Sequence, residues 1–145
     1  MKTLIKSATI LSPGSKYHGQ VKDISIDKGK IVQIGKNLSV EKAAVNNLSQ
    51  TFVSAGWIDL RANFREPGHE YKENLQSGAN AAKRGGFSKI VLMPSSTPVL
   101  DNKSQIDYII NRSKSLPVQL LPAGALTQNM KSAQLSEMFD MHTAG

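Results

Sequence analysis

The first third of the chain alternates short apolar runs with polar turns, which is typical of β-strands. Residues 2–12 are rich in β-branched side chains and predict a strand. Residues 21–35, VKDISIDKGKIVQIG, place two apolar stretches around an Asp-Lys-Gly turn, which predicts a β-hairpin. A further short strand is expected at residues 51–54. Residues 1–54 are therefore expected to form a small antiparallel β-unit with a β-sandwich-like arrangement.

After residue 54 the pattern changes to apolar strands that alternate with amphipathic helices. We expect strands at 56–60, 90–93 and 118–121, and helices at 75–84, 104–114 and 132–141. Trp57 is expected in the core, and Leu135, Met138 and Phe139 are expected on the inner face of the last helix. Continuous apolar strands separated by helices predict a parallel sheet with right-handed crossovers. Residues 55–145 are therefore expected to be an α/β unit made of three βα units.

The chain is too short to close such a sheet into a barrel. Three βα units leave an unpaired sheet edge, and a barrel of eight such units needs about 250 residues. The chain has 145 residues. We therefore expect it to be a fragment or the product of an interrupted reading frame.

Composition narrows the classes of partner and site. The chain has no cysteine, which excludes disulfides and thiolate-rich zinc sites. Its net charge of +7 comes from 18 basic and 11 acidic residues, and the lysines are scattered rather than clustered with aromatic side chains. This pattern predicts a solvated surface and no nucleic-acid binding, although the charge would also suit an acidic protein partner.

The chain offers no segment typical of export or membrane insertion. The apolar run near the N-terminus is interrupted by Lys6 and Ser7, so it is too short for a signal peptide. No stretch approaches the roughly 18 apolar residues of a membrane span. We expect a cytoplasmic protein that does not associate with membranes.

Three motifs occur in order along the chain. Residues 51–68 read TFVSAGWIDLRANFREPG, residues 85–87 read GGF, and residues 93–102 read MPSSTPVLDN. In this order and spacing they resemble the N-terminal third of a dihydroorotase of the amidohydrolase superfamily. The resemblance implies an amidohydrolase-type TIM barrel, of which residues 55–145 would be the first three βα units.

The metal-binding motif of that family is replaced in this chain. Dihydroorotases carry His-x-His at the end of the first barrel strand, and the resemblance implies zinc as the family cofactor. Here the two positions are Arg61 and Asn63. A guanidinium has no free lone pair and stays charged, and an asparagine offers at best a weak carbonyl ligand. We therefore predict no metal at these positions and no cofactor for this chain.

The resemblance also implies two substrate-binding positions, which we predict to be vestigial. Arg65 keeps the arginine that pairs with the substrate carboxylate in the family, and Ser95 occupies the position of a substrate-binding asparagine. Ser95 keeps a hydroxyl but loses the amide that both donates and accepts hydrogen bonds. Two interpretations of Arg65 stay open. It is either a structural partner of Asp59, Glu66 or Glu70, or the remnant of an anion site.

The three histidines do not restore a metal site. His18, His69 and His142 are far apart in sequence, and no two of them have metal-ligand spacing. His69 follows Pro-Gly in the loop after the first strand of the α/β unit, where barrel enzymes place active-site residues. We expect it to be a solvent-exposed loop histidine.

Three functional hypotheses remain. The first is a dihydroorotase-like protein of pyrimidine biosynthesis that has no catalytic residue and acts as a structural partner of aspartate transcarbamoylase, in a homo-oligomer or a hetero-complex. The second is an active metal-dependent amidohydrolase that cleaves a cyclic amide with ligands outside this segment. The third is a binding module that works through the basic β-unit. Loss of the metal ligands favours the first.

Overall fold

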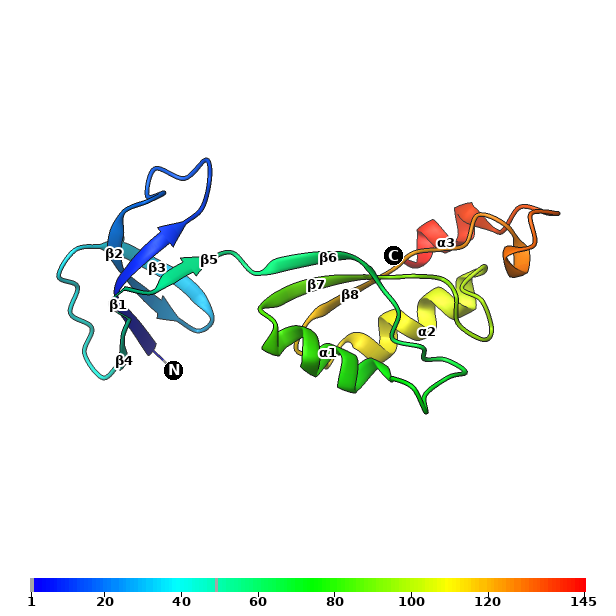
Figure 1. Ribbon diagram of the computed structural model, residues 1–145, viewed down its shortest axis with the longest axis horizontal. Coiled ribbons are helices and arrows are strands. Elements are labelled where there is room, and N and C mark those ends of the chain that lie inside the picture. The colour runs from blue at the N-terminus through cyan, green and yellow to red at the C-terminus, as the bar shows by residue number, and fades with distance from the viewer. Residues whose placement is uncertain (1, 49) are drawn as a thin grey trace. The chain divides into compact units, whose positions relative to one another are not determined.

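The chain folds into two compact units, residues 1–55 and 56–145, in a computed structural model that describes residues 2–48 and 50–145 (Figure 1). The first unit contains strands and turns, and the second alternates strands with helices.

The first unit is a five-stranded sheet. Its strands are β1 (Lys2–Leu11), β2 (Val21–Asp27), β3 (Lys30–Gly35), β4 (Ala44–Asn47) and β5 (Phe52–Ser54). The order is β3-β2-β1-β4, and β5 also pairs with β1. Leu4, Ala8, Ile10 and Ile24 form the buried apolar side chains of this unit.

Two strands of this sheet differ from the expectation of an antiparallel unit. The β1-β2-β3 part is antiparallel as expected, but β4 and β5 both run parallel to β1, so the sheet is mixed. The ten-residue β1 is long enough for both short strands to share one of its edges, β4 beside Thr3–Lys6 and β5 beside Thr9–Leu11. The five strands therefore belong to one hydrogen-bonded sheet and not to two facing sheets of a sandwich.

The second unit is a parallel sheet with helices between its strands. The strands β6 (Trp57–Ala62), β7 (Phe87–Leu92) and β8 (Gln119–Pro122) pair in the order β6-β7-β8, all parallel. The helices are α1 (Leu75–Arg84), α2 (Lys103–Ser113) and α3 (Met138–Ala144), and a 3-10 turn, η1 (Gln128–Met130), precedes α3. The expected succession of three βα units is present (Figure 1).

Local sequence explains where α1 and α2 begin. The side chains of Asn74 and Asn102 accept hydrogen bonds from the backbone N–H groups of Ser77 and Gln105, which caps both helices. The inner faces of both helices pack on the sheet in one apolar core, to which α3 adds Met141. The members of this core are Leu75, Ala79, Ile90, Leu92, Leu100, Ile106, Ile109, Val118, Leu120 and Met141.

The last helix starts later than predicted. Instead of spanning residues 132–141, α3 begins at Met138 and buries Met141, while Leu135, Met138 and Phe139 are exposed. The preceding segment is held as a loop by a bridge between Thr127 and Leu135. It also contains left-handed residues, which an α-helix does not accommodate; they are Asn129, Met130 and Ser132.

Trp57 is also not a core residue, with 63% of its surface exposed. It lies on β6, an edge strand whose other apolar side chains, Ile58 and Leu60, are exposed as well. Within the described residues, no helix combines the length and the apolar character needed to cross a membrane.

Candidate functional site

The residues singled out in the sequence lie where the parallel strands of the second unit end. Backbone bonds extend the pairing past the strands themselves, from Met93 N–H to Ala62 O and from Ala123 N–H to Leu92 O, each 2.9 Å. The loops after β6, β7 and β8 therefore leave the sheet at one edge. In parallel α/β sheets this edge carries the binding site.

Two of the substituted family positions contact each other directly. The Ser95 hydroxyl donates a 2.8 Å hydrogen bond to Asn63 Oδ1 and so connects the loop after β6 with the loop after β7. The bond uses one of the two lone pairs of the carbonyl oxygen, which is the atom of the amide that could bind a metal. The N–H₂ group of Asn63 donates hydrogen bonds and cannot bind a cation.

The two arginines of this region are exposed and unpaired. Within residues 2–48 and 50–145, neither Arg61 nor Arg65 makes a side-chain hydrogen bond or an ion pair. The Arg61 backbone N–H donates to Asp59 Oδ1 at 2.9 Å. Arg65 therefore pairs with none of the three carboxylates considered for it, and a structural role for its guanidinium is not supported.

Glu66 is the structural residue of this loop. It is 8% exposed, and its carboxylate accepts hydrogen bonds of 2.8 Å from the Leu75 N–H and from the Tyr108 hydroxyl. Arg112 lies 3.6 Å away as an ion-pair partner. A negative charge at the start of α1 is also favourable for the helix dipole. Glu66 thus ties the loop after β6 to both α1 and α2.

The environment of Tyr108 reflects the same cluster. Burial of the phenol raises its pKa, and the hydrogen bond to the Glu66 carboxylate raises it further because ionisation would place two negative charges together. The sequence analysis did not identify this cluster, because Glu66 and Tyr108 are 42 residues apart. The one available signal is an acidic residue before a helix, which does not indicate its partners.

His69 joins the two loops a second time. Its Nε2 lies 3.2 Å from the Thr97 hydroxyl, and the Thr97 N–H donates to Pro67 O at 3.0 Å. Gly68 has a φ of +98°, and a Cβ atom there would lie 2.2 Å from Thr97 O, so this approach requires glycine. His69 lies in a loop as expected, but it is half-buried and contacts Thr97, which corrects the expectation that it is solvent-exposed.

The donor set at the former ligand positions does not fit zinc. Arg61 has no lone pair to give, and the carbonyl of Asn63 is engaged by Ser95. Across the described part of the chain, no group of three or more His, Asp or Glu side chains is placed to hold a metal ion. His18 and His142 lie elsewhere, on the loop after β1 and in α3.

Comparison with known proteins identifies the family. The sequence model of the Dihydro-orotase-like family matches residues 51–145. The dihydroorotase of Aquifex aeolicus is 34% identical over 146 aligned positions, and that of Pelotomaculum thermopropionicum is 38% identical over 147. Each match covers 100% of this chain and 34% of the relative, so the chain spans about a third of the length of these proteins.

Solved structures agree on the fold. L-hydantoinase from Arthrobacter aurescens superimposes with a TM-score of 0.81 at 20% identity, over 99% of this chain and 31% of that protein. A D-hydantoinase superimposes with a TM-score of 0.69 at 24% identity, over 88% and 28%. These matches confirm the predicted α/β fold class, with its β-unit followed by three βα units. The chain belongs to the dihydroorotase-like family.

Proposed function

We propose that this protein is a catalytically inactive dihydroorotase-like protein of pyrimidine biosynthesis with a structural role. One observation carries the proposal: the two positions of the metal-binding pair hold Arg61 and Asn63, and the Asn63 carbonyl oxygen already accepts a hydrogen bond from Ser95. Arg61 adds a permanent positive charge where a divalent cation would have to bind. Both features oppose metal binding at this edge of the sheet.

Loss of the metal ligands matters because catalysis in the family depends on a bound metal. A metal-dependent amide hydrolase relies on its metal to lower the pKa of bound water and to polarise the carbonyl that is attacked. Hydrolysis therefore depends on the ligands that hold the metal. Arg65 and Ser95 are proposed to be remnants of the substrate site, because both are accessible at the sheet edge but neither can activate water.

The first test is elemental analysis together with a dihydroorotate hydrolysis assay on the protein at its natural length. We expect zinc far below one ion per chain and no turnover. Stoichiometric zinc with turnover would refute the proposal and would support an active amidohydrolase whose ligands lie outside this segment. A dihydroorotase of known activity, such as the Aquifex aeolicus relative, serves as the positive control for both measurements.

The double variant Arg61→His, Asn63→His tests whether these two positions alone account for the loss of zinc binding. Zinc binding restored by both changes together, and by neither alone, would locate the loss of metal at this pair. Zinc binding by the unmodified protein would contradict it.

The structural role is proposed to be that of a partner for aspartate transcarbamoylase in a hetero-complex. The support is the family resemblance and the basic surface of the chain, with its net charge of +7. Co-purification with aspartate transcarbamoylase from the same organism is the test. A protein that elutes free of the enzyme at native concentration would overturn this part of the proposal without affecting the metal-site argument.

A further inference from the structure

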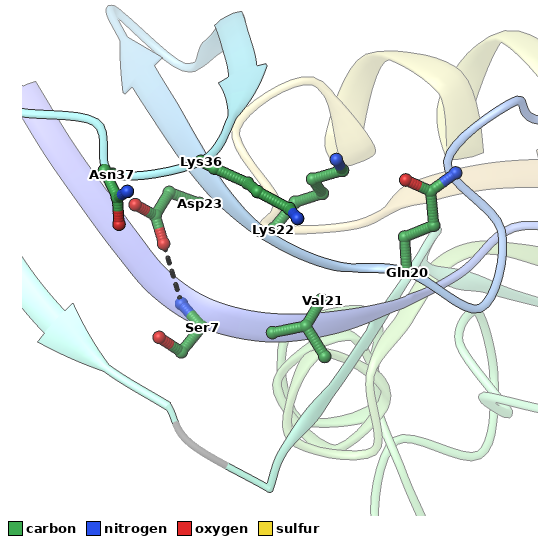
Figure 2. Close-up of a pocket in the computed structure, with 7 residues that line it drawn as sticks. All are labelled: Ser7, Gln20, Val21, Lys22, Asp23, Lys36 and Asn37. Atoms are coloured by element: carbon green, nitrogen blue, oxygen red, sulfur yellow. Dashed lines mark hydrogen bonds between the residues drawn. The ribbon is translucent and has the colours of Figure 1, made fainter.

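The β-unit contains a polar hollow that lies outside the edge described above. Its volume is about 490 Å³, which falls within the range of small-molecule sites, roughly 300–1,000 Å³. Its walls come from the middle of β1, from the start of β2 and from the segment after β3 (Figure 2). All of the residues that line it belong to residues 1–55, so the hollow is complete within one unit.

Asp23 fixes the walls of this hollow. Its side chain is 4% exposed, and its two oxygens accept hydrogen bonds of 2.9 Å from the backbone N–H groups of Ser7 and Leu38. Ser7 and Asn37 have φ values of +58° and +54°, a conformation that residues other than glycine seldom adopt. The buried carboxylate thus holds two unusual backbone turns beside the hollow, which makes its shape preorganised.

The charge left for a ligand is positive. Asp23 is neutralised by its N–H donors and by Lys6, whose Nζ lies 3.8 Å away. Lys22 and Lys36 also line the hollow, and their ammonium groups have no partner among the residues that the structure describes. In Figure 2 the Lys36 side chain extends from the Asn37 side of the hollow toward Lys22.

Neutral donors complement these charges. The amides of Gln20 and Asn37 line the same hollow, and each carries an N–H₂ group that donates hydrogen bonds. The Gln20 amide nitrogen already donates to Lys16 O at 2.8 Å, which orients that side chain. Ammonium and amide donors around a preorganised hollow are the chemistry that recognises phosphate and carboxylate oxygens.

We propose that the hollow between β1, β2 and the segment after β3 binds a small anion with at least two negative charges, such as a phosphate monoester or a dicarboxylate. Lys22 and Lys36 supply the positive charge, and Gln20 and Asn37 supply neutral hydrogen bonds. Asp23, which also lines the hollow, positions the walls through its backbone partners and Lys6. This site is independent of the sheet edge where β6, β7 and β8 end and does not rest on the function proposed above.

The test is an NMR titration of the full ¹⁵N-labelled chain with inorganic phosphate and, separately, with succinate at constant ionic strength. We expect saturable shifts of the backbone amides of Lys22, Lys36 and Asn37 with one or both probes. The probe that binds with the higher affinity shows whether the hollow prefers phosphate or carboxylate groups. Lys36→Gln is expected to weaken binding about tenfold, the effect of one charge-assisted hydrogen bond.

Lys30→Gln is the matched control, because Lys30 lies exposed on β3 of the same unit and does not line the hollow. It makes the same change in net charge and should leave binding unchanged. Equal weakening by both variants would show only general attraction to a basic chain and would overturn the proposal. Absence of saturable shifts at these residues with both probes would overturn it as well.

Discussion

Asn63 and Ser95 connect two loops at one edge of the parallel sheet through a 2.8 Å hydrogen bond. The family resemblance implies that these positions correspond to a metal ligand and a substrate-binding amide. The sequence identified both positions through the resemblance, but it could not predict that the two replacements bond to each other. That contact depends on how two loops 32 residues apart approach at the ends of adjacent strands.

A double-mutant cycle tests whether this bond contributes to stability. We expect Asn63→Ala and Ser95→Ala each to lower the free energy of unfolding by about 0.5–1.5 kcal/mol, the usual range for one hydrogen bond. The double variant should lose less than the sum, because each single change already removes the bond. Urea unfolding followed by circular dichroism provides the measurement. Additive effects would mean that the two side chains act independently.

Substitution of Glu66 is expected to lower the free energy of unfolding by more than substitution of Asn63 or Ser95. Glu66→Ala is expected to lower the free energy of unfolding by about 1–3 kcal/mol, because it leaves the buried N–H of Leu75 without its partner. Tyr108→Phe should cost less, since it removes one of several donors to the carboxylate. The same urea assay measures both variants.

Asp107→Ala is the control for Glu66, because Asp107 is an exposed carboxylate on α2 whose ion pair with Lys103 is a surface pair. If Glu66→Ala were no more destabilising than this control, the role of Glu66 as a tie between loop and helices would be wrong.

At the scale of elements, the clearest sequence signals were those with a local cause. The α1 boundaries at Leu75 and Arg84 were predicted correctly, because an asparagine cap precedes the helix and two glycines follow it. The parallel order of β6, β7 and β8 followed from apolar strands separated by helices. The helix predicted at 132–141 was wrong over residues 132–137, because Ser132 is left-handed and Leu135 bridges to Thr127, features that apolar spacing does not reveal.

The missed strand and the mixed sheet have a non-local cause. β4, with the sequence AVNN, has little strand propensity and forms because the edge of β1 is available beside it. The resemblance pointed to Asn63 and Ser95, and the structure has them in contact after β6 and β7; the lack of a metal there stays a prediction. The Glu66 cluster and the Asp23 turns were not foreseen, because both depend on contacts between elements that are distant in the sequence.

Asp23 makes the β-unit sensitive to acid. Hydrogen bonding, first from the Ser7 N–H, lowers the pKa of Asp23 below its ordinary value of 3.8. A lowered folded-state pKa contributes stability that is fully present above 3.8 and is lost as the pH falls through the folded-state value. We therefore expect unfolding of the β-unit in the acid range below 3.8 to be steeper in the native chain than in Asp23→Asn.

Thermal unfolding from neutral pH to strongly acidic pH, followed through the NMR signals of β1 and β2, measures this difference. At neutral pH, Asp23→Asn should already be less stable, because the amide has one acceptor oxygen and its N–H₂ group would face one of the two N–H donors. Parallel pH profiles for the two proteins would show that the carboxylate charge does not hold the turns.

At the scale of the whole molecule, the chain covers about a third of its relatives and leaves apolar surface uncovered on both units. On the first unit, Val45 and Phe52 are 57% and 63% exposed. On the second, Ile58 and Leu60 of the edge strand β6 are 51% and 72% exposed. Surface of this kind is typical of an element that meets another layer of protein.

The exposed edge of β6 also carries the single tryptophan of the chain, and this gives the molecule an intrinsic optical reporter. Because Trp57 is 63% exposed, we expect its fluorescence to resemble that of an indole in water and to be quenched readily by acrylamide. Any polypeptide that covers this edge should shift the emission to shorter wavelength and protect it from the quencher. Without a label, the same signal would then give the affinity and the rate of that association.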